Sequence, residues 1–239
     1  MLSLLSWKNE LITIIIDADQ IVLHWIAPQK KSPTRTFILK AQAVVPIETG
    51  NNQSHLYNLT DIKKNVLQFI KTNNIKNAFA CMAITAPGIV EQFVACPIAS
   101  PTHDTFTSIT PQNLIWDYVY LYPDDERNAF IFYLCGISQQ QLLQYKLLAI
   151  SSNIELKAVM TQQMALIQLY HAMQGPAFRH SQLAVSLQRT NNNIDKLFTS
   201  ESIHRMLTID PKVSLNFSQH APYLRTTLGL ALSSGLYKG

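Results

Sequence analysis

A run of apolar residues at positions 11–16, Leu-Ile-Thr-Ile-Ile-Ile, predicts a strand that is covered on both faces. A strand exposed on one face would alternate apolar and polar side chains, whereas this run is apolar at both sets of alternating positions and is rich in β-branched residues. We therefore expect residues 11–16 to form a central strand with helices on both sides of the sheet. The run ends in Asp17-Ala18-Asp19-Gln20, a turn that carries two carboxylates.

The next two apolar segments predict an antiparallel meander. Residues 21–26 are apolar at most positions, and residues 36–45 alternate apolar and polar side chains as a half-covered strand does. A four-residue turn and a polar loop at residues 28–33 separate the segments. Because antiparallel strands are joined by short links, we expect three consecutive antiparallel strands.

The remaining elements follow from the same patterns. A helix is expected to begin at Thr60 as N-cap, with Asp61 in its positive first turn, and to end at Asn73. Further strands are predicted over residues 78–84, 90–96, 114–122, 129–135 and 154–159, and further helices at the caps Ser138 and Thr161. Beyond residue 176, the pattern predicts strands over residues 183–187 and 213–217, a helix over 199–207, and a last helix over 223–234 with Pro222 in its first turn.

The order of these elements predicts the fold class. The predicted order is three strands, a helix, a strand, an insertion, a strand, a helix, a strand and a helix. This is the order of the ribonuclease-H-like half of the actin and Hsp70 superfamily. We expect an α/β protein with such a mixed sheet and flanking helices. The predicted core comprises residues 1–88 and 127–176, residues 89–126 form an inserted small subdomain, and residues 177–239 form a second half too short to be complete.

Composition narrows the class of protein. Apolar residues make up 47% and charged residues 14%, which indicates a globular chain, and a formal net charge of +4 without a dense basic cluster argues against a nucleic-acid groove. The longest apolar stretch, residues 78–90, is shorter than the ~20 residues of a membrane helix. Residues 1–5 lack the length and preceding basic region of a signal peptide. We expect a cytoplasmic protein whose three cysteines, Cys81, Cys96 and Cys135, are buried reduced thiols.

Asp17 and Asp19 are the main candidates for chemistry. A two-metal nuclease uses such a pair when other strands add carboxylates, but Thr85 and Thr161, where two other predicted strands end, have no neighbouring acid. A polar hairpin turn is therefore the favoured interpretation. The seven histidines lie in unrelated segments, and no G-x-S-x-G motif occurs. We expect no catalytic residue and no metal site.

Alternate positions of the predicted strand 114–122 carry aromatic side chains, namely Trp116, Tyr118, Tyr120 and Tyr122. Two interpretations of this face stay open. It is packed core, or it borders a groove in which an extended apolar peptide pairs with a sheet edge. In the second interpretation Phe93, on the neighbouring strand 90–96, joins Trp116, Tyr118 and Tyr120 as the candidate partner-binding residues.

Several segments match one family in sequence order. They are Trp116-Asp117-Tyr118, residues 128–136, residues 141–149, Met164-Ala165-Leu166 and Leu228-Gly229-Leu230-Ala231-Leu232. This series resembles the PilM/HofM-like family of type IV pilus assembly proteins, in its short form, and the resemblance covers most of residues 11–175 and 222–239. It implies an actin-like, ribonuclease-H-like fold.

The first turn departs from that family. Full-length members carry an Asp-x-Gly-Ser turn there, in which the glycine and neighbouring amides let the backbone approach a phosphate. The turn from Asp17 to Gln20 has no glycine or serine and adds a second negative charge at Asp19, and no second Asp-x-Gly turn follows residue 176. We therefore expect a degenerate phosphate turn at Asp17 and Asp19, without an ATP or Mg²⁺ cofactor.

The resemblance implies a non-catalytic scaffold of pilus assembly, cytoplasmic and peripheral at the inner membrane. It would bind the N-terminal cytoplasmic tail of a PilN-type inner-membrane protein, beside the inserted subdomain around residues 89–122, and the pilus assembly ATPase as a second partner. Two alternatives stay open: a GspL-like cytoplasmic domain of type II secretion, and a nucleotide- or metal-dependent enzyme of the same superfamily that uses Asp17 and Asp19.

Overall fold

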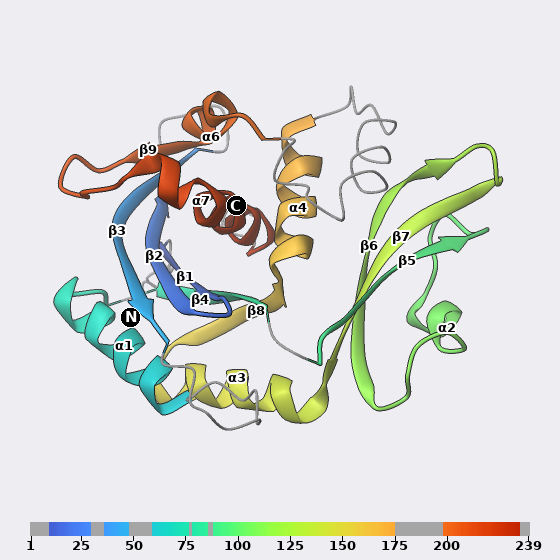
Figure 1. Cartoon of the computed structure of the whole chain (residues 1–239), viewed down its shortest axis with the longest axis horizontal. Helices are drawn as coiled ribbons and strands as arrows, with labels where there is room; N and C mark the ends of the chain where they lie inside the picture. Colours follow the sequence, from blue (N-terminus) through green and yellow to red (C-terminus); the bar gives the residue numbers. More distant parts are fainter. Residues whose placement is uncertain are drawn as a thin grey trace, which may run out of the picture.

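A computed structural model describes residues 10–29, 36–47, 59–76, 78–85, 88–174 and 198–234, and the predicted strand at 183–187 lies outside this range. The main sheet has six strands in the order β8-β4-β1-β2-β3-β9 (Figure 1). These strands are β1 (Glu10–Ile16), β2 (Gln20–Pro28), β3 (Phe37–Pro46), β4 (Ala78–Ile84), β8 (Glu155–Thr161) and β9 (Leu207–Ile209).

The strand order confirms the predicted fold class. Strands β1, β2 and β3 form the expected antiparallel meander, while β4 lies parallel to β1 and β8 lies parallel to β4. The order β3-β2-β1-β4-β8, with β2 alone antiparallel to the others, is that of the ribonuclease-H-like half. Residues 11–16 of β1 are all buried, as expected for a central strand.

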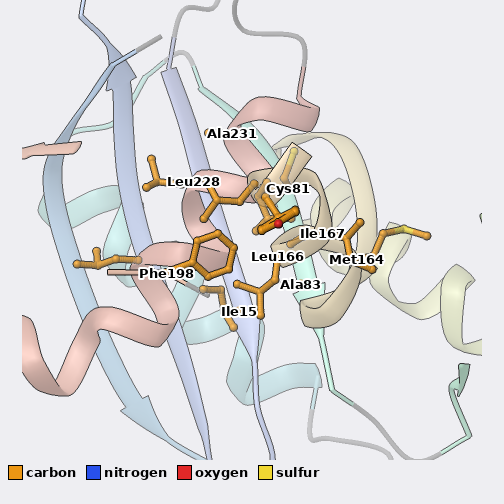
Figure 2. Packing of buried hydrophobic residues seen from close by; sticks show 14 of the residues in the cluster. Ile15, Cys81, Ala83, Met164, Leu166, Ile167, Phe198, Leu228 and Ala231 are labelled. Carbon is orange, nitrogen blue, oxygen red and sulfur yellow. The ribbon is translucent and has the colours of Figure 1, made fainter. Parts of the chain in front are cut away.

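Helices cover both faces of the main sheet. On one face lie α1 (Leu59–Thr72) and α3 (Gln139–Ser151), packed against Ile12, Ile14 and Ile16. On the other lie α4 (Gln162–Gln174) and α7 (Phe217–Ser233), whose apolar side chains share one core with Leu11 and Ile15. Figure 2 shows Ile15 in this core. Alternate residues of β1 thus supply two separate cores, because successive strand side chains point to opposite faces.

Helices α4 and α7 approach each other at Gly229. A Cβ built at Gly229 would lie 1.9 Å from the carbonyl oxygen of Ala165, a backbone atom of α4. A glycine is therefore required for this approach. The glycine in the segment Leu228-Gly229-Leu230-Ala231-Leu232 thus has a packing reason in this fold.

A second, antiparallel sheet has the order β5-β7-β6. It comprises β5 (Val90–Cys96), β6 (Leu114–Asp124) and β7 (Ala129–Ser138), with the short helix α2 (His103–Phe106) between β5 and β6. The prediction that residues 129–135 form a strand of the core sheet is wrong, because β7 belongs to the second sheet. The inserted part of the chain therefore extends beyond its predicted end at residue 126. Strand β7 is apolar on both faces because it is the central strand of this smaller sheet, and that pattern does not identify which sheet a strand joins.

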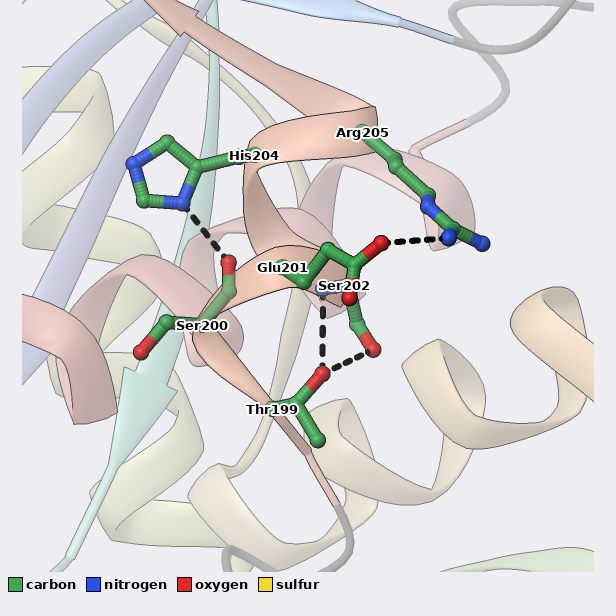
Figure 3. Close-up of polar contacts among 6 residues, drawn as sticks. All are labelled: Thr199, Ser200, Glu201, Ser202, His204 and Arg205. Atoms are coloured by element: carbon green, nitrogen blue, oxygen red, sulfur yellow. Dashed lines mark hydrogen bonds and ion pairs between the residues drawn. The ribbon is translucent and has the colours of Figure 1, made fainter.

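The C-terminal region adds to the main sheet. Helix α6 (Ser200–Met206) begins at Thr199, whose hydroxyl accepts a hydrogen bond from the backbone N–H of Ser202 (Figure 3), and β9 then pairs in parallel with β3. The predicted strand at 213–217 is wrong, since residues 213–216 are irregular. Helix α7 begins at Phe217, so Pro222 lies inside the helix and not in its first turn.

Among the described residues, no helix is both long enough and apolar enough to cross a membrane.

Candidate functional site

The carboxyl ends of β1, β4 and β8 meet at one edge of the main sheet. Open α/β sheets bind ligands beyond such ends, so a ligand site is expected at this edge. Asp17 follows β1, and Thr85 follows β4, its backbone N–H donating to the carbonyl of Ile16 at 2.9 Å. Thr161 ends β8, and its hydroxyl caps α4 by accepting from the N–H of Met164 at 3.1 Å.

The candidate phosphate turn is a closed hairpin turn. The backbone N–H of Asp17 donates to the carbonyl of Gln20 at 2.9 Å, and the Oδ1 atom of Asp17 accepts from the N–H of Ala18 at 2.8 Å. Asp17 is half-buried, and Asp19 is exposed. The turn thus uses Asp17 to order its own backbone, as aspartate commonly does in turns.

The second carboxylate oxygen of Asp17 is also occupied, by a residue of α7. The hydroxyl of Tyr223 donates to Oδ2 of Asp17 at 3.1 Å, and the side-chain amide of Gln20 donates to that hydroxyl. Burial, with the nearby Asp17 carboxylate as a second cause, raises the pKa of Tyr223 above its ordinary value. The phenol therefore stays protonated at neutral pH and remains a donor to Asp17.

A cavity of about 250 Å³ opens beside this edge, between the main sheet and β5. It is lined by Ile84, Thr85, Ile89, Glu91, Thr161, Gln162 and Gln163. The hydroxyl of buried Tyr133, on β7, donates to the carboxylate of Glu91 and lies 3.1 Å from the hydroxyl of Thr161. Burial, followed by the charge of Glu91, raises the pKa of Tyr133.

This cavity suits an anion poorly. The N-terminus of α4 supplies the positive end of a helix dipole, but the carboxylate of Glu91 lines the same space. The side-chain amide of Gln162 already donates to Thr85 at 2.9 Å. No glycine is among the described residues that line it, so these residues do not offer the close backbone approach that phosphate sites use.

Within the described ranges, no group of three or more His, Cys, Asp or Glu side chains is placed to hold a metal ion. The cysteines of this part of the chain are unpaired, with Cys81 and Cys96 buried and Cys135 half-buried. Burial raises the pKa of both Cys81 and Cys135 to about 12, so these thiols are protonated and weakly nucleophilic.

The candidate partner-binding residues do not share one face. Side chains of Trp116, Tyr118 and Tyr120 pack with Phe132 on one face of the second sheet. Phe93 pairs in register with Tyr133, and the centroids of the two tilted rings lie 5.5 Å apart, which places Phe93 on the opposite face. The prediction that strands 90–96 and 114–122 are neighbours is also wrong, since β7 separates them.

Tyr122 departs from the predicted aromatic face because of a β-bulge. The pairing of β6 with β7 shifts between Tyr120 and Tyr122, and Tyr122 consequently packs in the core beneath α4 and α7. A bulge inserts one extra residue into a strand. Because side chains alternate between the two faces of a sheet, the extra residue moves every later side chain of that strand to the opposite face. No feature of the sequence marks this bulge.

The face with Trp116, Tyr118 and Tyr120 forms a small core of its own. Helix α2 covers it, with Phe106 5.0 Å from the ring of Tyr118, whose hydroxyl donates to the carbonyl of Pro101 at 2.6 Å. The indole of Trp116 lies against Gly136 and donates to the carbonyl of Pro111 at 3.1 Å. Of the two interpretations, this packing supports core for the three side chains, whereas Phe93 is 40% exposed.

A second hollow, of about 430 Å³, runs between α3 and β8, the strand at the edge of the main sheet. Its lining is mostly apolar and includes Leu142, Ala149, Ile150 and Leu156. The sequence gives the apolar character of α3, but not that part of α3 faces outward.

A buried polar cluster was not expected from the sequence. The Nδ1 atom of His24 on β2 lies 2.7 Å from the hydroxyl of Thr227 on α7, which in turn lies 3.0 Å from the hydroxyl of Thr13 on β1. Among the described residues, the Nε2 atom of His24 has no hydrogen-bond partner. The partners are more than 200 positions apart, so no local pattern could have joined them.

No protein-family model and no curated protein matches the chain. Among solved structures, it is similar to the "PilM-PilN type IV pilus biogenesis complex", at 11% identity and a TM-score of 0.54, over 67% of this chain and 50% of that one. It thus spans about half the length of that relative. The cytoplasmic domain of EpsL, an inner membrane component of the type II secretion system of Vibrio cholerae, gives 10% identity and a TM-score of 0.36, over 65% and 57%.

A Bacteroides thetaiotaomicron protein with an actin-like ATPase fold gives 13% identity and a TM-score of 0.39, over 70% of this chain and 57% of that one. Of these three likenesses, the one to the PilM-PilN structure alone exceeds a TM-score of 0.5. At such low identity it shows a shared fold, in agreement with the strand order of the main sheet.

Proposed function

We propose that this chain is a non-catalytic scaffold of pilus assembly that binds the N-terminal cytoplasmic tail of a PilN-type inner-membrane protein. The observation that carries the proposal is the fold shared with the PilM-PilN complex. On this proposal the protein is cytoplasmic and is held at the inner membrane by its partner, with the assembly ATPase as a further partner.

The occupied turn supports the non-catalytic part of the proposal. Both oxygens of Asp17 accept hydrogen bonds from within the protein, and the turn has no glycine that would let a phosphate approach. An added negative charge at Asp19 would further oppose a triphosphate.

Calorimetric titration with Mg-ATP tests that part. We expect no binding in the low micromolar range, either for the wild type or for Tyr223→Phe, which frees one oxygen of Asp17. Binding that tight, weakened by Asp17→Asn, would contradict the proposal and favour an enzyme or nucleotide switch. Binding gained only by Tyr223→Phe would show that the tyrosine alone blocks the site.

We propose that the tail binds at the outer edge of β5, which pairs with no further strand in the described part of the chain. Strand β5 ends the order β5-β7-β6, and Val90 and Phe93 are 37% and 40% exposed on it. An extended peptide would gain main-chain hydrogen bonds from this edge, and the exposed apolar side chains would select its residues. Phe93 replaces the half-buried residues Trp116, Tyr118 and Tyr120 of β6 as the principal contact.

Fluorescence anisotropy with a labelled PilN-type tail tests this site. Phe93→Ala should weaken binding by roughly tenfold, equivalent to ~1.4 kcal/mol. The control Ile98→Ala, at a residue that is 51% exposed just beyond β5, should bind as the wild type does. Unchanged affinity of a folded Phe93→Ala variant would place the tail elsewhere. Absence of any tail binding by the wild type would remove the proposed partner.

A further inference from the structure

Helix α3 carries large apolar side chains on its outward side as well as on the side that the protein covers, with Gln140, Gln144 and Lys146 between them. Tyr145, Leu148 and Ala149 are buried against the main sheet. On the opposite side, the exposed fractions of Leu143, Leu147 and Ile150 are 53%, 53% and 70%. These three residues follow the i, i+4, i+7 spacing of one helical stripe. An exposed apolar stripe of this kind is typical of a surface that contacts another protein or a membrane.

Helix α1 extends this outer surface. Both helices pack on the same face of the main sheet, away from α4 and α7, so their outward sides point in the same direction (Figure 1). The outward residues of α1 are Thr60, Lys63, Lys64, Leu67, Gln68 and Lys71, which line a shallow hollow of about 440 Å³. Leu67 is 39% exposed. The α1/α3 face therefore combines lysines with exposed leucine and isoleucine side chains.

The charge of this face is almost entirely positive. Helices α1 and α3 contain four lysines, Lys63, Lys64, Lys71 and Lys146, and one acidic residue, Asp61. Within the described parts of the chain, no ion pair joins any of these lysines to a carboxylate. A second copy of the chain placed on the same face by two-fold symmetry would set lysine against lysine, which disfavours a homodimer here.

We propose that the α1/α3 face docks directly on an anionic lipid bilayer. Lysines are attracted to the negative headgroups, and the leucine and isoleucine side chains enter the boundary between headgroups and acyl chains. The lysine stems can lie along the apolar boundary while their ammonium groups stay in the headgroup layer. Leu143 and Leu147 stand out from a helix surface and line neither hollow, which suits a fluid surface better than a shaped acidic protein. This contact goes beyond the proposed function, in which a protein partner alone supplies the link to the membrane.

Co-sedimentation of the full chain with vesicles tests the proposal. Vesicles of phosphatidylglycerol and phosphatidylcholine in equal amounts should retain the protein at low salt and release it at high salt, and pure phosphatidylcholine vesicles should retain little. Each lysine near an anionic surface strengthens binding roughly fivefold, so Lys63→Glu, Lys64→Glu and Lys71→Glu combined should lower the partition coefficient by at least a hundredfold. Leu143→Ser with Leu147→Ser should lower it by roughly tenfold.

Matched control variants carry the same changes elsewhere on the surface. Arg127→Glu, Arg205→Glu and Lys212→Glu alter the net charge equally at exposed sites, and Ile98→Ser with Ile109→Ser removes two isoleucines that are 51% and 48% exposed. Both control sets should retain most of the vesicle binding. No retention on anionic vesicles at low salt, or equal losses in the control sets, would overturn the proposal. A dimer in sedimentation velocity that Leu143→Ser with Leu147→Ser dissociates would assign the face to a second copy instead.

Discussion

At the scale of residues, α7 supplies the hydrogen-bond partners of two polar side chains of the main sheet and its first turn. It brings Tyr223 to Asp17 and Thr227 to His24, across more than 200 positions of sequence in each pair. The sequence predicts that the turn from Asp17 to Gln20 carries two carboxylates and no phosphate-binding glycine. It cannot predict that a tyrosine donates to one of them, because that contact depends on where α7 packs.

His24 should make the protein sensitive to acid. Burial, followed by the nearby charge of His220, lowers the pKa of His24 from 6.5 to about 3. Below pH 6.5 the unfolded chain binds a proton at this site that the folded protein does not, so the free energy of unfolding falls as pH falls toward 3. The loss is about 1.4 kcal/mol per pH unit in this window, and above it His24 contributes no pH dependence.

Urea denaturation over a series of pH values checks this prediction. His24→Asn keeps a side chain that can bond to Thr227 but does not titrate, and it should flatten the acid slope of stability. The control His103→Asn replaces an exposed histidine and should keep the wild-type slope. Equal slopes for the wild type and His24→Asn would show that His24 titrates normally in the folded protein.

At the scale of elements, local patterns predicted those features that depend on neighbours in sequence. The continuous apolar run gave β1, short links gave the meander, and Ser138 caps α3 as expected, accepting from the N–H of Gln141 at 3.1 Å. Errors arose where long-range packing decides. The bulge at Tyr120 and the assignment of β7 to the second sheet are not encoded in side-chain periodicity, and tertiary contacts hold Pro222 inside α7 against its usual preference.

Gly229→Ala should lower the stability of the protein, although replacing a glycine by alanine inside a helix usually raises stability. An alanine in the middle of a helix is normally about 1 kcal/mol more favourable than a glycine. At Gly229, however, the new methyl group would meet the backbone of Ala165, and rigid backbone cannot move aside as a side chain can. We expect a loss of about 3 kcal/mol or more in the free energy of unfolding, since α4 and α7 must separate.

Thermal and urea unfolding measure this effect. Gln219→Ala, at an exposed position in the first turn of the same helix, is the control and should change stability by less than about 0.5 kcal/mol. Wild-type stability in Gly229→Ala would mean that α4 and α7 do not pack at the distance described.

At the scale of the whole molecule, Tyr133 joins the two sheets. Its ring lies in the core shared with α4 and α7, and its hydroxyl contacts Glu91 of the second sheet and Thr161 of the main sheet. The second sheet is therefore linked to the main sheet by a buried polar contact. It is also linked covalently, because α3 follows β7 directly in the chain. The sequence predicted an insertion here but not this contact, because Glu91 and Tyr133 meet only after β5 and β7 pair.

Tyr133→Phe should weaken that attachment. The change leaves the apolar ring in place but removes the hydroxyl that donates to the carboxylate of Glu91, and a hydrogen bond to a charged group at an exposed residue such as Glu91 contributes about 1 kcal/mol. Chemical denaturation should show this loss in the wild-type background. With Glu91→Gln already present, the further change to phenylalanine should cost less, because the charge that needs the donor is gone. An identical cost in both backgrounds would show that the two side chains act independently.

The late position of α7 in the chain also bears on synthesis at the ribosome. One face of the main sheet, including Leu11 and Ile15, is covered partly by residues 217–233, so that face stays open until those residues have been translated. Contacts such as that between Thr13 and Thr227 span 214 positions, and pairings so distant form slowly and leave apolar surface exposed meanwhile. Until then, this apolar face of the nascent chain is a surface that chaperones can bind.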